Sequence, residues 1–90
     1  MAQVGMDVDL VRGIGNQLKN KANDIETIIT QIDNLINQAI GAWQGNDANQ
    51  FRDWWNQQHR PAMSRAAEAV EGLGQSAMNN ADEQEGVSNR

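Results

Sequence analysis

The sequence predicts an all-α protein, an antiparallel helix-turn-helix hairpin that pairs with a second hairpin into a four-helix bundle dimer. Two long segments carry apolar residues at steps of three and four, one glycine-containing break separates them, and the strict alternation of a strand is absent. Leu, Ile, Val and Phe make up only 17 of the 90 residues. We therefore expect a single domain over 1–90 that completes its core against a partner.

The first helix is expected over about residues 8–40. Asp7 and Asp9 suit its N-cap and first turn. At 1.5 Å per residue such a helix is roughly 50 Å long, and it needs a partner along its length to be stable in water. Two neighbouring apolar lines run along it: Val11, Ile14, Leu18, Ile25, Ile28, Ile32, Leu35 and Ala39 in the first, and Ala22, Ile29, Ile36 and Trp43 in the second.

The turn is expected at residues 41–46, where two glycines interrupt the helical pattern. Asn46 or Asp47 can cap the helix that follows, and Asp47 with Gln50 three residues later resembles a capping box. A loop this short between two long helices makes them antiparallel.

The second helix is expected over about residues 47–80, and its apolar stripe is poorer, with alanine where the first helix has isoleucine. Pro61 lies inside the pattern and predicts a kink near residues 57–61, because proline lacks a backbone N–H and clashes with the preceding turn. The expected stripe is Ala48, Phe51, Trp55, Ala62, Ala66, Ala69 or Val70, Leu73 and Ala77.

The end of the hairpin that holds both termini is expected to be the looser one. Gly13, Gly15, Gly72 and Gly74 each weaken a helix by about 1 kcal/mol. Residues 81–90 are acidic and almost without apolar side chains, which predicts a flexible acidic tail.

Composition excludes several classes of function. A net charge of −5 is against nucleic-acid binding, and basic residues are too scattered for a membrane-surface helix. The chain has no Cys, no Tyr and one His, so we expect no metal site, no cofactor and no catalytic residues. His59 stands in a polar stretch typical of a solvated surface. Asp82, Glu83 and Glu85 lack the spacing of a calcium loop.

Four aromatic residues gather around the expected turn. We expect Trp43 to cap the end of the interhelical seam, with Phe51 and Trp55 packed beneath it. Trp54 lies about 100° from Trp55 around the helix axis, so the two indoles cannot share one face. One of them is therefore expected to face a second chain or a binding groove.

A Trp-x-Gly motif, formed by Trp43 and Gly45, stands in the middle of the chain between two amphipathic helices. Residues 1–15 carry Asp7 and Asp9 and lack the apolar run of a signal peptide. This arrangement resembles the WXG100 family of ESAT-6-like proteins, the small substrates of type VII (ESX) secretion systems. The resemblance covers nearly the whole chain.

The resemblance implies a hairpin that dimerises and is secreted, folded and without a signal peptide, from the cytoplasm by the type VII system. It also implies recognition by an FtsK/SpoIIIE-type secretion ATPase through a C-terminal Tyr-x-x-x-Asp/Glu signal. That pattern falls on Met78 and Asp82, or on Asn79 and Glu83, without the tyrosine. Either this chain carries a divergent signal, or it travels with a partner that carries the full one.

The expected partner is a second copy or another WXG100 protein, and the sequence leaves this choice open. It also leaves open a cytosolic helical adaptor that is not secreted, and a co-secretion partner or chaperone of another WXG protein. We expect the dimer interface mainly on the first helix, because its two apolar lines can contact its own mate and a partner together. The residues expected in the core and dimer seam are Ile14, Leu18, Ile25, Ile28, Ile29, Ile32, Leu35, Ile36, Phe51 and Trp55.

Overall fold

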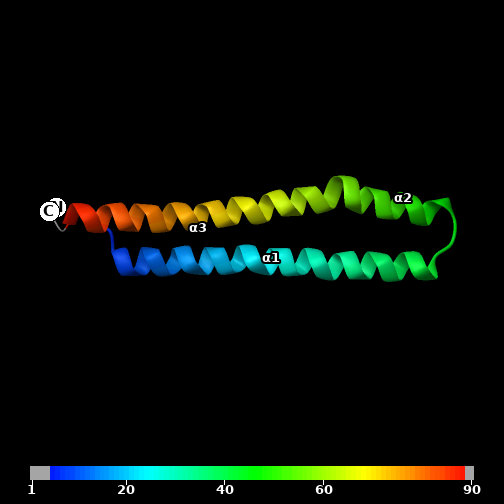
Figure 1. Cartoon of the computed structure of the whole chain (residues 1–90), viewed down its shortest axis with the longest axis horizontal. Coiled ribbons are helices and arrows are strands. Elements are labelled where there is room, and N and C mark those ends of the chain that lie inside the picture. Colours follow the sequence, from blue (N-terminus) through cyan, green and yellow to red (C-terminus); the bar gives the residue numbers. More distant parts are fainter. Residues whose placement is uncertain (1–4, 89–90) are drawn as a thin grey trace.

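The computed structural model describes residues 5–88 and shows one long helical hairpin (Figure 1). Helix α1 spans Val8–Ala42; α2 spans Asn46–Trp54, a π-helical turn η1 spans Trp55–His59, and α3 spans Arg60–Ser88. The two arms lie antiparallel, with the turn at one end and the start of α1 near the end of α3 at the other. The hairpin measures 67 × 17 × 15 Å, and the prediction of an all-α antiparallel hairpin is confirmed.

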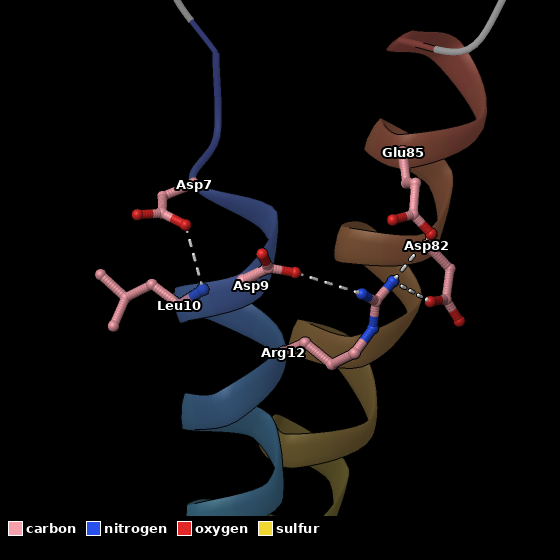
Figure 2. Close-up of polar contacts among 6 residues, drawn as sticks. All are labelled: Asp7, Asp9, Leu10, Arg12, Asp82 and Glu85. Atoms are coloured by element: carbon pink, nitrogen blue, oxygen red, sulfur yellow. Dashed lines mark hydrogen bonds and ion pairs between the residues drawn. The ribbon is translucent and has the colours of Figure 1, made fainter.

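Helix α1 begins where the sequence indicated. Asp7 is its N-cap, and the Asp7 carboxylate accepts a hydrogen bond of 3.1 Å from the backbone N–H of Leu10 (Figure 2). This bond satisfies one of the donors that a helix N-terminus leaves without a partner. The helix ends at Ala42, because Trp43 is extended and returns its N–H to the carbonyl of Ile40.

The turn is shorter than the expected 41–46 and consists of residues 43–45. Gly45 is the N-cap of α2, with φ 116° and ψ 178°. This backbone region is essentially reserved for glycine. No side chain caps α2, so the capping roles predicted for Asn46 and Asp47 are wrong: the chain enters the helix through Gly45, whose carbonyl accepts from the N–H of Ala48.

A π-helical turn at Trp55–His59 precedes the proline that predicted a kink. Pro61 has no N–H to donate to the preceding turn, and the backbone widens there, with the N–H of Arg60 bonded to the carbonyl of Trp55. Residues five apart lie about 140° from each other on an α-helix but on one face across a π-turn. Trp55 and Arg60 therefore point the same way.

The seam between the two arms follows seven-residue steps on both sides. The steps on the second arm break once, between 55 and 60, where the π-turn inserts a residue. This insertion corrects the predicted stripe: Ala62, Ala66 and Leu73 are exposed and lie beside the seam rather than in it. The buried positions are Gly15, Ala22 and Ile29 on α1, Ala48 on α2, Trp55 in η1, and Ala67, Gly74 and Ala81 on α3.

Gly15 and Gly74 form a close contact between α1 and α3. A Cβ on Gly15 would lie 2.9 Å from the carbonyl oxygen of Gly74, and one on Gly74 would lie 2.7 Å from that of Gly15. The two backbones approach to a distance that only glycine permits. Both glycines are therefore packing residues, and the looser terminal end predicted from them stays a prediction. Gly13 and Gly72 have open space around them.

Helix α3 continues to Ser88, well beyond the expected end near residue 80. The expected flexible tail at 81–90 is corrected over 81–88, which are helical; residues 89–90 lie outside the described part. Ala81 is fully buried against the first arm, and Arg12 of α1 bonds to Asp82 one residue later. These contacts come from residues about seventy positions away, so the local acidic composition did not reveal them.

Candidate functional site

A broad apolar surface runs along one side of the hairpin. On α1, Ile14 is 43% exposed, Ile28 44% and Leu35 61%, although these side chains favour burial. Each stands one residue before a seam position, which places it about 100° from the seam. On α3, Leu73 occupies the equivalent place and is 60% exposed. We call this surface the outer face; it comprises exposed Leu10, Ile14, Ile28, Leu35 and Leu73, with half-buried Leu18, Ile25, Ile32, Met63 and Val70.

The expected seam residues therefore divide into two groups. Ile29 and Trp55 lie in the seam within the hairpin, and Ile36 and Phe51 are half-buried near the turn. The remaining six lie on the outer face, where three are exposed and three are half-buried. They are Ile14, Leu18, Ile25, Ile28, Ile32 and Leu35.

The opposite side of the seam is closed by polar contacts. Arg12, Lys19 and Asp33 stand seven and then fourteen residues apart along α1, and each lies about 40° from the seam on the side away from the outer face. The Lys19 ammonium donates to the Gln75 side-chain oxygen at 2.5 Å. Polar contacts thus join the two arms along one side of the seam, which we call the polar edge, and the apolar outer face is exposed on the other side.

Asp33 anchors the polar edge beside the π-turn. Its carboxylate accepts from the Trp55 indole N–H at 2.8 Å and from the Arg60 guanidinium at 3.0 Å through Nε and 3.0 Å through Nη2. The hydrogen bonds from Arg60 and then from Trp55 lower the pKa of Asp33, and the bond to Asp33 raises the pKa of Arg60. Sequence analysis missed this contact because it depends on the inserted residue.

The candidate secretion-signal residues lie in ordered helix at the terminal end. Met78 is half-buried, with its Cγ over Gly15. The Asp82 carboxylate accepts from Arg12 at 2.7 Å, and Glu85 accepts from the same nitrogen at 3.3 Å (Figure 2). The bond to Asp82 is the main reason that the pKa of Arg12 is raised. Glu83 is exposed.

The Trp-x-Gly motif shapes the other end of the hairpin. The Trp43 ring packs on Phe51 with centroids 5.3 Å apart, as predicted, and Trp43 stays 41% exposed, so it covers the end of the seam only in part. Trp55 is 7% exposed and points to the first arm, whereas Trp54 is 57% exposed and points outward. A cleft of about 430 Å³ opens between the exposed aromatics. It is lined by Trp43, Asp47, Gln50, Phe51 and Trp54.

Two kinds of feature are absent from the residues that the structure describes. No group of three or more His, Cys, Asp or Glu side chains is placed to hold a metal ion there. Within 5–88, no helix has the length and apolar character needed to cross a membrane.

The family model described as WXG100, proteins of 100 residues with WXG, matches residues 3–86. The chain belongs to the WXG100 family. Its Trp-x-Gly motif is the turn formed by Trp43 and Gly45, between the two arms that the structure shows. The family predicted from the motif and its position is therefore confirmed.

Solved structures show the same WXG100 fold. The secreted protein EsxB from Bacillus anthracis str. Sterne is similar with a TM-score of 0.84 and 24% identity, over 98% of this chain and 99% of that one. A single-substitution mutant of that protein gives a TM-score of 0.83 and 24% identity, over 98% and 97%. No curated protein matches the chain.

Proposed function

We propose that this chain is exported by a type VII secretion system as a folded dimer, formed with a second copy or with another WXG100 protein. Family membership supports the export route, and the solved relatives with this fold are described as secreted proteins. The observation that carries the proposal is the outer face. A chain destined to remain a monomer would not keep Ile28 and Leu35 so exposed on one side.

A four-helix bundle accounts for the outer face. Two hairpins that place these faces together bury the isoleucines and leucines of α1 and the exposed Leu73 of α3, while the polar edges stay in water. Burial of apolar area contributes about 25 cal/mol per Å², which makes this face the main source of assembly energy. The interface then lies mainly on the first arm, as the two apolar lines predict.

The dimer is tested by light scattering on the size-excluded protein, alone and co-expressed with a second WXG100 protein. We expect the mass of two chains in one of the two samples. Ile28→Asp should abolish the dimer, because an unpaired charge in an apolar interface costs several kcal/mol. Ile28 lies outside the seam, so helicity should remain. Asn34→Asp, on an exposed position of the same helix, is the matched control and should still dimerise.

A stable monomer in both samples would overturn the dimer. It would also leave the outer face without an explanation.

We infer that the last turns of α3, with Met78, Asp82 and Glu83, are the segment that the FtsK/SpoIIIE-type ATPase recognises. The chain offers an apolar side chain at 78 and an acid four residues later on a helix that is already formed. Because Asp82 is bound to Arg12, the receptor either replaces Arg12 or reads the pair together. Glu83 is exposed beside them.

Export is measured as the amount of protein in the culture supernatant of a bacterium with a type VII system, with and without its ATPase. Asp82→Asn and Glu83→Gln should each lower export several-fold, and Glu71→Gln, an exposed acid on the same helix, should not. Arg12→Gln breaks the ion pair with Asp82 but keeps the acid. It therefore distinguishes a receptor that reads the Arg12–Asp82 pair from one that binds Asp82 in place of Arg12. Export that is independent of the ATPase would favour the cytosolic adaptor or a different route.

A further inference from the structure

The cleft at the turn end has walls of two kinds. Trp43, Phe51 and Trp54 line it with aromatic rings, and Phe51 is half-buried. Asp47 and Gln50 supply its polar part, and no Lys or Arg lines it. The faces of aromatic rings carry a negative electrostatic potential, and a carboxylate adds a full negative charge. This combination attracts a cation and repels an anion.

Each of the two indoles has a contact partner of its own. Trp43 packs on Phe51, whereas the Trp54 indole N–H donates to the Gln58 side-chain oxygen at 2.9 Å. His59 adds an edge-on contact to Trp54, with ring centroids 4.7 Å apart. The cleft therefore exists before any ligand enters, which reduces the ordering that binding requires.

We propose that this cleft binds an arginine or lysine side chain presented by a separate protein partner. A purely apolar occupant would bury Asp47 without a partner, and an acidic one would oppose it. A second copy of this chain is a poor source of the cation, because most of its basic groups already bond within the hairpin. Arg12 and Arg60 hold carboxylates, Lys21 pairs with Asp24, Lys19 holds Gln75, and Arg52 holds Asn49.

This inference goes beyond the proposed function, because neither export nor dimerisation enters the argument. It assigns a ligand class to the exposed part of the Trp-x-Gly turn. Trp43 and Trp54 supply cation–π contacts, and Asp47 supplies the ion pair.

The test uses the indole N–H signals of the full chain in a proton–nitrogen correlation spectrum. The probe is the tripeptide amide acetyl-Gly-Arg-Gly, and its matched control replaces arginine with citrulline, which keeps the shape but removes the charge. We expect saturable shifts of Trp43 and Trp54 and none of Trp55, whose indole is bound to Asp33. The arginine peptide should bind about threefold to tenfold more tightly than the citrulline peptide.

Two variants make the charge requirement specific. Asp47→Asn should weaken arginine binding towards the citrulline level, with only the cation–π preference left, and it removes no cap hydrogen bond from the helix start. Asp53→Asn removes the same charge from the same helix outside the cleft and should leave binding unchanged. Equal affinity for both peptides, no saturable shift, or equal behaviour of the two variants would overturn the proposal.

The same spectrum detects a second copy in the cleft. Shifts of Trp43 and Trp54 that follow protein concentration without peptide, and that vanish in the Ile28→Asp variant, would also overturn the proposal.

Discussion

The two halves of the hairpin are held together by different means. In the half near the termini, glycine and alanine let α1 and α3 approach until their backbones touch. In the half near the turn, the Trp55 indole and the Arg60 guanidinium bond to Asp33 across the arms, and the π-turn that begins at Trp55 marks the change between the two kinds of packing. Small residues allow the two helices to approach each other closely, whereas large residues bury more apolar surface between them. The terminal half uses Gly15, Ala22, Ala67, Gly74 and Ala81, and the turn half uses Ile29, Ala48 and Trp55.

This difference means that the turn half carries most of the energy of the isolated hairpin. Trp55→Ala should lower the free energy of unfolding by about 3–5 kcal/mol, because it removes the largest buried side chain and leaves a cavity. Trp54→Ala, the neighbouring indole that faces outward, should change it by about 0.5 kcal/mol at most. Urea unfolding at one fixed protein concentration measures both. Equal losses would mean that the two indoles are not divided between inside and outside.

The terminal half should be sensitive to a single added methyl group. Gly74→Ala should cost about 1–3 kcal/mol, because its Cβ would meet the backbone oxygen of Gly15. Gly72→Ala, two residues away in open space, should instead stabilise the helix by about 0.5–1 kcal/mol. Thermal unfolding monitored by circular dichroism shows whether each substitution lowers or raises the unfolding temperature. A gain in both variants would show that the close backbone contact is absent in solution.

The junction between the halves should tolerate a deletion that other places do not. Removing Gln57 together with Pro61→Ala turns the π-turn into an α-turn and keeps Trp55 and Arg60 on one face, now four residues apart. We expect stability within about 1 kcal/mol of the parent. Removing Glu68 with the same Pro61→Ala change should be far worse, since it rotates the seam positions that follow by about 100°. The unfolding temperatures of the two deletion variants are compared with that of the parent. Equal decreases would contradict the proposal that the π-turn is the place where the second arm carries one extra residue.

These contrasts also show how far the sequence could predict the structure. Local chemistry was sufficient for the existence of the two arms, the cap at Asp7 and the place of the turn, but not for the bounds of the turn or the end of α3. It was not sufficient for the seam, because the lines through Ile28 and through Ile29 are both apolar and only the opposing helix selects between them. The signal that was overlooked is the spacing of small residues, since Ala67, Gly74 and Ala81 stand seven apart.

The candidate functional positions were less predictable for a related reason. Met78 and Asp82 were placed by a motif, but their contacts with Gly15 and Arg12 join residues more than sixty positions apart. A proline in a helix indicates a disturbance without saying whether the backbone bends or widens. The widening at η1 places Trp55 and Arg60 on one face, where both contact Asp33. The periodicity of the local sequence does not indicate this contact.

The smallest effect concerns pH and the ion pair of the turn half. The pKa of Asp33 is lowered in the folded chain, first by Arg60 and then by Trp55. Its charged form therefore adds stability above the unfolded pKa of about 3.9, and that stability is lost as the pH falls through the lower, folded pKa. Asp33→Asn should lower the unfolding temperature at neutral pH, and the difference from the parent should shrink below about pH 4.

Asp53→Asn is the control for the general loss of one negative charge. The Asp33 effect should be modest because this pair is partly exposed, and exposed pairs contribute little. If the parent and Asp33→Asn keep a constant difference from pH 7 to pH 2, the carboxylate acts through its shape and hydrogen bonds alone. The contact between the arms in the turn half would then depend on the packing of Trp55 rather than on charge, and the turn half would resemble the terminal half more closely than the structure indicates.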